Sequence, residues 1–216
     1  MHAPPQPDSV LLGVIILAAG ASSRMGRPKL LLPWGRTTVL GHLLEQWKQL
    51  GAEQIAVVIS ARDEVLMGEL DRLGSPSTNR IMNPQRDRGM FSSIQCAARW
   101  DGWRPVVSHF AITLGDQPHL QVETLRQLVV FTGQHAAHVC QPARQGRPKH
   151  PVVMPGAVFE QLRHSSASSL KEFLTPFAGS LMLCGSEDPG LELDLDEPRD
   201  YERAYQMCFG RLPELE

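Results

Sequence analysis

The chain reads Val14-Ile-Ile-Leu-Ala-Ala-Gly-Ala-Ser-Ser-Arg-Met-Gly-Arg-Pro-Lys29 at the point that decides its fold. An apolar run typical of a buried strand passes directly into a loop of small residues that carries Arg24 and Lys29. Small residues let backbone N–H groups approach an anion, and the two cations add charge that amides lack. The stretch predicts a strand and a phosphate-binding loop; an ordinary glycine-rich surface turn is the plainer alternative.

Two common nucleotide-binding loops do not fit this segment. A P-loop needs Gly-Lys-Ser/Thr after its four variable residues, whereas Gly26 is followed by Arg-Pro-Lys29. The dinucleotide fingerprint needs three glycines within six positions, and the segment lacks that spacing. What remains is a strand, a flexible glycine loop and a lysine placed after a proline.

Four later motifs narrow the interpretation of this loop. In chain order they are Asn83-Pro-x-x-x-x-Gly89-Met90-x-x-Ser93, Leu114-Gly-Asp116-Gln-Pro118, Gly146-Arg147-Pro-x-His150-Pro151 and Asp194-Leu-Asp196-Glu-Pro198-x-Asp200. Over roughly positions 12 to 205 the chain resembles the MobA-like nucleotidyltransferases similar to molybdenum cofactor cytidylyltransferase. The resemblance implies a Mg²⁺-dependent enzyme that moves CMP, or less readily GMP, from the nucleoside triphosphate to a phosphorylated acceptor. It implies that the acceptor is molybdopterin or the molybdenum cofactor and that pyrophosphate is released.

Strand-like and helix-like segments alternate along the chain, which predicts an α/β fold, a Rossmann-like three-layer α/β/α arrangement around a mostly parallel sheet. Strands are expected at 12–18, 55–59, 80–82, 106–114, 137–140, 151–154, 181–184 and 191–195. Helices are expected at 63–73, 90–100, 122–132, 157–163, 168–174 and 199–207, and one between a cap at Thr37 or Thr38 and Gly51.

The domain division is expected to be simple. Residues 1–10 form a disordered tail, and residues 11–208 form one domain with a nucleotide-binding half (11–120) and an acceptor-binding half (121–208), the latter bearing a smaller substrate-side subdomain.

Composition limits the partners. The 216 residues carry a formal net charge of −2, which gives no general attraction to nucleic acid or anionic membrane. The four cysteines lie far apart and are expected to be reduced thiols. No targeting segment stands out, so a cytoplasmic protein is expected, as a monomer or weak dimer. The resemblance adds a nucleoside triphosphate as partner and contact with a molybdoenzyme.

The acidic residues suggest a metal site. Asp116 follows a buried strand, at the edge where open α/β sheets bind ligands, and carboxylates suit Mg²⁺. Asp194 and Asp196 alternate with leucines, so in a strand both would share one face. The plainer alternatives are a turn-capping Asp116 and a solvated edge strand. The resemblance favours Asp116 with a late aspartate, and Asp194 is preferred over Asp196.

The resemblance also assigns roles to single residues. Catalysis falls to Lys29, Arg24 and Asp116. Acceptor binding falls to Gln117, Pro118, Arg147 and His150. The nucleotide-binding set is Leu17, Ala18, Ala19, Gly20, Ser22, Ser23, Arg24, Met25, Gly26, Lys29, Asn83, Gly89 and Ser93.

Substrate choice depends on two positions. Guanylyl-transferring relatives tend to have Gly where this chain has Ala19, so CTP is favoured over GTP. Lys149 stands where relatives of the cytidylyltransferase type have Gly, which leaves the acceptor open. Two alternatives therefore stay in view: a transferase for another small phosphate ester such as a sugar or polyol phosphate, and a non-catalytic protein that binds the molybdenum cofactor.

Overall fold

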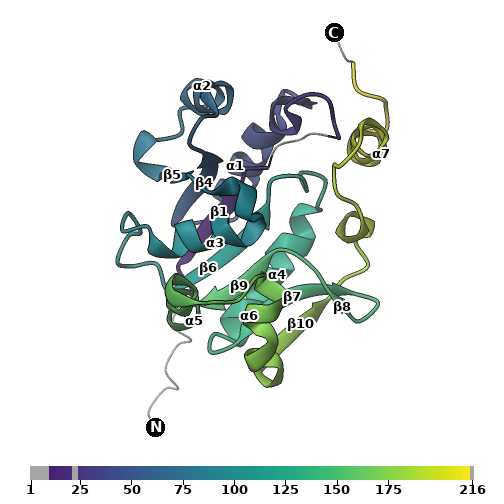
Figure 1. Cartoon of the computed structure of the whole chain (residues 1–216). Coiled ribbons are helices and arrows are strands. Elements are labelled where there is room, and N and C mark those ends of the chain that lie inside the picture. The colour runs from purple at the N-terminus through teal and green to yellow at the C-terminus, as the bar shows by residue number, and fades with distance from the viewer. Residues whose placement is uncertain (1–9, 21–23, 215–216) are drawn as a thin grey trace.

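A computed structural model describes residues 10–20 and 24–214. Its centre is a mixed sheet with helices on both faces (Figure 1). The main-sheet strands are β1 (Leu12–Leu17), β4 (Gln54–Ser60), β5 (Arg80–Asn83), β6 (His109–Leu114), β7 (Val139–Arg144), β8 (Arg147–Pro148), β9 (Val152–Pro155) and β10 (Leu181–Gly185). Their order is β10-β7-β9-β6-β1-β4-β5, with β8 paired to β7. Strand β9 runs antiparallel to its neighbours β6 and β7, and β8 runs antiparallel to β7, whereas the other pairs are parallel.

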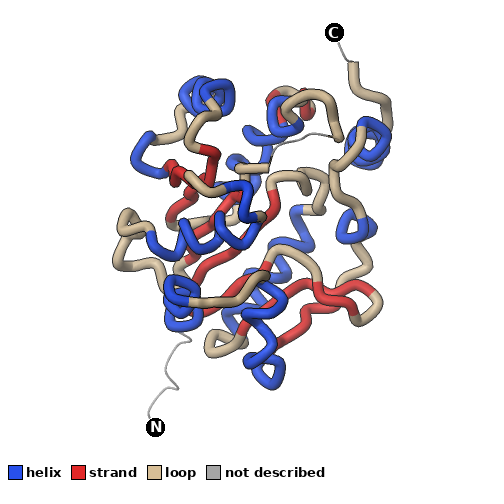
Figure 2. The backbone as a smooth tube through the Cα atoms, viewed as in Figure 1, coloured by secondary structure: helices blue, strands red, loops and turns tan. Residues whose placement is uncertain are grey.

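The helices form the two outer layers (Figure 2). They are α1 (Val39–Gln49), α2 (Glu64–Arg72), α3 (Met90–Arg99), α4 (Val122–Gln134), α5 (Gly156–Gln161), α6 (Leu170–Leu174) and α7 (Pro198–Phe209). One core joins α1, α2, α4 and α7 to the sheet, and a second core joins α3, α5 and α6 to its other face. The predicted three-layer fold is confirmed. Within the described ranges, no helix is long and apolar enough to cross a membrane.

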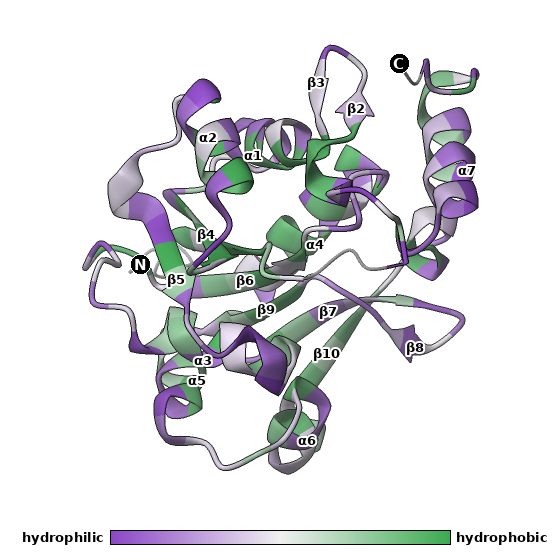
Figure 3. Cartoon of the chain, turned by 45° about the horizontal axis from the view of Figure 1, so that its top comes forward, coloured by the Kyte–Doolittle hydropathy of each residue, from purple (hydrophilic) through white to green (hydrophobic). Residues whose placement is uncertain are grey.

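The alternation of strand side chains explains the two cores. Val14 and Ile16 of β1 pack in the first core, and Ile15 packs in the second, because successive strand residues point to opposite faces. Strands buried on both faces are largely apolar, and Figure 3 shows β9 and most of β6 in the hydrophobic colour.

The expected strand at 191–195 is wrong. Pro189–Glu192 forms a 3-10 helix instead, because Asp188 caps it by accepting a hydrogen bond from the N–H of Gly190. The following backbone bonds to a loop rather than to a strand: the N–H of Leu195 donates to the carbonyl of Asp116, in the loop after β6, at 3.1 Å. The leucines at 191, 193 and 195 are nevertheless buried in the core, whereas Glu192 and Asp194 between them are not. The alternation reflects an extended segment lying over the core, not a strand.

The last helix holds the segment that follows Lys29. A short hairpin of β2 (Pro33–Trp34) and β3 (Thr37–Thr38) places the Trp34 ring against Tyr201 and Tyr205 of α7. The Tyr201 hydroxyl donates to the Pro33 carbonyl at 2.5 Å. This packing ties the loop before α7, which carries Asp196, to the chain just beyond the glycine loop.

Candidate functional site

The site begins where two parallel strands end side by side. Leu17 of β1 is paired in register with Leu114 of β6, so the glycine loop and Asp116 leave the sheet together. Gly115 permits this close approach: its N–H donates to the Leu17 carbonyl at 3.1 Å, and a Cβ on Gly115 would lie only 2.7 Å from that oxygen. Any larger residue would push the two strand ends apart.

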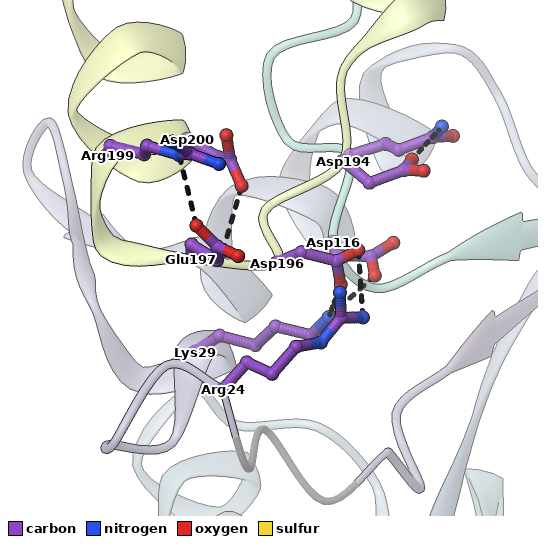
Figure 4. A network of polar contacts seen from close by, with 9 residues as sticks. Arg24, Lys29, Asp116, Asp194, Asp196, Glu197, Arg199 and Asp200 are labelled. Carbon is purple, nitrogen blue, oxygen red and sulfur yellow. Dashed lines mark hydrogen bonds and ion pairs between the residues drawn. The ribbon is translucent and has the colours of Figure 1, made fainter.

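Two cations meet two carboxylates at this edge (Figure 4). Lys29 Nζ lies 2.6 Å from Asp116 Oδ2 and 3.8 Å from Asp196 Oδ1. The Lys29 and Asp116 side chains are only 15% and 20% exposed. Arg24 Nη2 lies 2.9 Å from Asp196 Oδ2. The predicted Lys29, Arg24, Asp116 and Asp196 therefore form one charged network.

Asp194 lies beside this network (Figure 4). Gln117 Nε2 donates to Asp194 Oδ1 at 2.8 Å. Loss of solvent around the carboxylate raises the pKa of Asp194, and repulsion from Asp116 and then Asp196 raises it further. Asp194 is thus close enough to Asp116 and Asp196 to be repelled by both carboxylates.

The donor set fits a hard divalent cation. Asp116 Oδ1 is buried and has no hydrogen-bond partner, which is costly for a carboxylate oxygen unless a ligand completes it. Across the described ranges, no three metal-ligating side chains are already gathered around one point. A Mg²⁺-type site does not require that, because water and phosphate oxygens complete its coordination.

A cavity of about 280 Å³ connects most of the predicted nucleotide-binding residues. Its lining includes Leu17, Ala18, Ala19, Gly20, Lys29, Gly89, Ser93 and Asp116. Sequence reasoning missed the lining residues Leu30, Arg86, Asp87, Met90, Leu114 and Gly115. Three of these, Met90, Leu114 and Gly115, stand inside the motifs quoted above; Arg86 and Asp87 occupy variable motif positions, so no sequence signal distinguished them.

The segment after β5 is shaped by a glycine. Gly89 has φ +84° and precedes the first turn of α3, a conformation that a residue with a Cβ adopts only with strain. Asn83 lies beneath this turn, almost fully buried, and donates to the hydroxyls of Ser92 and Ser93 at 2.9 Å. Its oxygen accepts from the N–H of Gln85. Asn83 thus orients Ser93 and does not line the cavity itself.

Two further residues of the glycine loop have different surroundings. Met25 is buried in the first core. Gly26, with φ +69°, lines an adjoining hollow of about 360 Å³. Ser22 and Ser23 lie outside the described residues.

The predicted acceptor-binding residues are only partly brought together. Gln117 and His150 lie near the carboxylates, since Asp194 and Asp116 act electrostatically on His150. Burial lowers the pKa of His150, so its ring is neutral near pH 7. Pro118 is buried, whereas Arg147 lies exposed on β8.

Lys149 is engaged within the protein. Its Nζ lies 2.9 Å from Glu192 Oε2, so part of its positive charge is neutralised.

Comparison with known proteins places this geometry in context. A family model described as the MobA-like NTP transferase domain matches residues 14–179. Molybdenum cofactor cytidylyltransferase of Escherichia coli K12 is 28% identical over 191 residues, covering 87% of this chain and 92% of that protein. Nicotine blue oxidoreductase of Paenarthrobacter nicotinovorans is 27% identical over 197 residues, covering 85% of this chain and 92% of that protein.

A solved structure shares the fold. The crystal structure of a manganese complex of a Mycobacterium tuberculosis H37Rv protein matches with a TM-score of 0.69 at 23% identity, covering 92% of this chain and 99% of that one. Relatives of nearly equal identity carry different activities in their names. Substrates therefore have to be argued from the site itself.

Proposed function

The chain belongs to the MobA-like NTP transferase family, and from that premise we propose that it transfers a cytidylyl group from CTP to a phosphorylated acceptor of the molybdopterin type, releasing pyrophosphate. Residues 11–120 would bind the nucleotide, and residues 121–208 would bind the acceptor. The nearly full-length similarity to a molybdenum cofactor cytidylyltransferase supports this choice of acceptor. Contact with a molybdoenzyme that receives the product, made by a monomer or weak dimer, belongs to the same proposal.

One observation carries the proposal: Lys29 and Asp116, 87 residues apart in sequence, meet at 2.6 Å in the cavity that the Ala18–Gly20 segment lines. Nucleotidyl transfer needs a cation and a carboxylate beside a loop of small residues, and this cavity has all three. The lysine offsets phosphate charge, and the loop admits the triphosphate closely.

The reaction needs alignment more than it needs a base. An oxygen of the acceptor phosphate is already ionised and attacks the α-phosphorus. The bond from that phosphorus to the β-phosphate oxygen breaks, and its electron pair leaves with pyrophosphate. Lys29 and Arg24 would offset the charge on the transferred group, and Ser93 and Gly89 would help hold the nucleoside. No proton has to be removed by the protein.

A divalent cation fits this arrangement. Asp116, with Asp194 or Asp196, would hold Mg²⁺, and the ion when bound supplies Lewis-acid charge stabilisation to the phosphates. The buried and unpartnered Oδ1 of Asp116 supports this assignment.

Base choice is assigned to Ala19. Its side chain is 7% exposed and lines the cavity, so its methyl group takes up room that a glycine would leave open. The smaller cytosine base suits the narrower space better than guanine does.

Acceptor binding is assigned to the part of the site around Asp194. Gln117 and His150 lie there and offer an amide and a neutral imidazole. Glu192 already pairs with Lys149, so the added charge of Lys149 by itself does not favour a different, more highly charged acceptor. Arg147 is exposed on β8, where its side chain could reach the distal part of a long acceptor.

A direct assay tests the proposal. Purified protein is incubated with Mg²⁺, one of the four common ribonucleoside triphosphates and either molybdopterin or a sugar or polyol phosphate, and pyrophosphate is measured. Release that needs CTP and molybdopterin supports the proposal. Release with a sugar or polyol phosphate alone would favour the second acceptor class. Binding of molybdopterin without release under any pairing would favour a non-catalytic protein.

A further inference from the structure

Arg86 stands at the junction of three hollows. It begins the 3-10 turn Arg86–Arg88 between β5 and α3. The residue lines the 280 Å³ cavity, the adjoining hollow of about 360 Å³ and a third hollow of about 640 Å³ beside residues 60–65. None of the motifs quoted above specifies this residue.

The 360 Å³ hollow is cationic. Arg27, Lys29 and Arg86 line it, and Asp63 is the one acidic residue in its lining. Asp63 is already engaged, because its Oδ1 accepts from the N–H of Leu66 at the start of α2. Three cationic residues thus face one carboxylate in this lining, so the hollow offers net positive charge to an anion.

The guanidinium of Arg86 is weakly held. Its Nε lies 3.8 Å from Asp87 Oδ1, and the Asp87 side chain is 98% exposed. A pair of that length with a fully solvated carboxylate holds an arginine in place only weakly. Two other arginines nearby are better anchored: Arg88 donates to Gln85 Oε1 at 2.9 Å, and Arg24 lies 2.9 Å from Asp196.

The residues that line the cavity and the hollow indicate how a nucleotide would lie across both. Lys29 lines both the 280 Å³ cavity and the 360 Å³ hollow, whereas Asp116, Ala19 and Ser93 line only the first. A nucleotide with its base at Ala19 and its α-phosphate at Lys29 and Asp116 would extend its remaining phosphates past Lys29. That path leads into the cationic hollow.

We propose that Arg86, with Arg27, binds the β- and γ-phosphates of the nucleoside triphosphate and the pyrophosphate that leaves. The inference rests on the proposed function. As the bond between the α-phosphorus and the bridging oxygen breaks, negative charge grows on that oxygen and stays with pyrophosphate. The planar fork of a guanidinium suits phosphate oxygens two at a time. Arg86 thereby distinguishes a triphosphate from a monophosphate.

The test is calorimetric binding of CTP and CMP in the presence of Mg²⁺. Arg86→Met is compared with the wild type and with Arg88→Met, a matched control from the same turn whose side chain lines none of the three hollows. We expect Arg86→Met to weaken CTP binding by about tenfold or more, the loss of one charge-assisted contact, and to leave CMP binding within about twofold. Arg86→Lys should recover part of the loss, since charge returns without the fork.

Several outcomes would overturn the inference. Equal weakening of CTP and CMP would place Arg86 at the base or ribose, and unchanged CTP binding would remove its role. If the wild type binds another nucleoside triphosphate better than CTP, that triphosphate is compared with its own monophosphate in the same way. The inference about Arg86 therefore does not depend on the base assigned in the proposed function. If no triphosphate binds at all, both proposals fail. Circular dichroism and thermal unfolding verify that each variant is folded.

Discussion

Lys29 Nζ lies 2.6 Å from Asp116 Oδ2, while the other oxygen of that carboxylate, Oδ1, is buried without a hydrogen-bond partner. The lysine thus neutralises Asp116 from one side and leaves the second oxygen available. A metal ion and Lys29 would compete for the charge of the same carboxylate, unless a triphosphate draws the lysine away. Nucleotide and metal are therefore expected to bind with positive coupling.

Lys29→Met should separate these two roles of the lysine. We expect pyrophosphate release to fall by about 10²-fold or more, because a preorganised cation at the phosphates is lost. In the absence of nucleotide, the same variant should bind Mn²⁺ more tightly than the wild type does, since Asp116 no longer has its partner at 2.6 Å. Electron paramagnetic resonance of free Mn²⁺ measures the second effect. Weaker Mn²⁺ binding by the variant would contradict the proposed competition.

The two late aspartates should behave differently. Asp196 is already paired with Arg24 and Lys29, whereas the pKa of Asp194 is raised by burial and by the charge of Asp116. A divalent cation relieves that repulsion at Asp194. We therefore expect Asp194→Asn to weaken Mn²⁺ binding in the presence of CTP by about tenfold or more, comparable to the loss of one ligand-shell group.

Asp196→Asn should mainly change the apparent KM for CTP, since it releases Arg24 from its 2.9 Å contact. Glu192→Gln is the matched control, because Glu192 pairs with Lys149 and not with the Lys29 network. A larger loss of Mn²⁺ affinity in Asp196→Asn than in Asp194→Asn would reverse the assignment.

Local pattern was enough to predict that Lys29 and Asp116 come together, and the family resemblance supplied the roles proposed for them. The carboxyl ends of neighbouring parallel strands lie at the same edge of a sheet. A small-residue loop after one such strand and an aspartate after the next therefore lie close together. This happens for β1 and β6, so Lys29 and Asp116 meet. The prediction needed no knowledge of contacts between distant segments beyond the fold class itself.

Features that depend on several loops were not predictable. Residues 191–195 alternate like a strand, but the Pro189–Glu192 turn and the bond from Leu195 to Asp116 keep this segment out of the sheet. The role proposed for Arg86 depends on hollows that it lines together with segments 17–20, 26–30, 60–66 and 114–116, which are distant in sequence. Asn83 supports Ser93 from beneath, which its place in a motif did not reveal.

Ala19→Gly should relax base selection. Removing the methyl group from the cavity wall makes room for a purine, so the ratio of kcat/KM for CTP to that for GTP should fall by about tenfold, as expected for one buried carbon in a pocket. The ratio is its own control, because damage to the common triphosphate site lowers both activities together. A wild type that turns over CTP and GTP equally well, or a variant with an unchanged ratio, refutes the role of Ala19.

His119 is expected to make the stability of the protein depend on pH. It is 3% exposed, and its Nε2 lies 3.1 Å from the Gly190 carbonyl and 2.9 Å from the Leu193 carbonyl. Nε2 therefore carries the proton of the neutral ring. Nδ1 is buried without a hydrogen-bond partner, so a second proton there would gain nothing. Burial lowers the pKa of His119 despite the nearby charges of Asp188 and Asp194.

The sign of the effect follows from this lowered pKa. In the unfolded chain His119 takes up a proton as the pH falls through about 6.5, but the folded protein does not until the pH is lower. The free energy of unfolding should then fall by up to about 1.4 kcal/mol per pH unit from this group. In His119→Gln, a side-chain amide can donate to the same carbonyls and does not titrate. Urea unfolding at pH 7.5 and 5.5 should give a smaller decrease for His119→Gln than for the wild type. His42 and His150, whose pKa values burial also lowers, contribute equally to both proteins, and parallel pH curves would rule His119 out as the source.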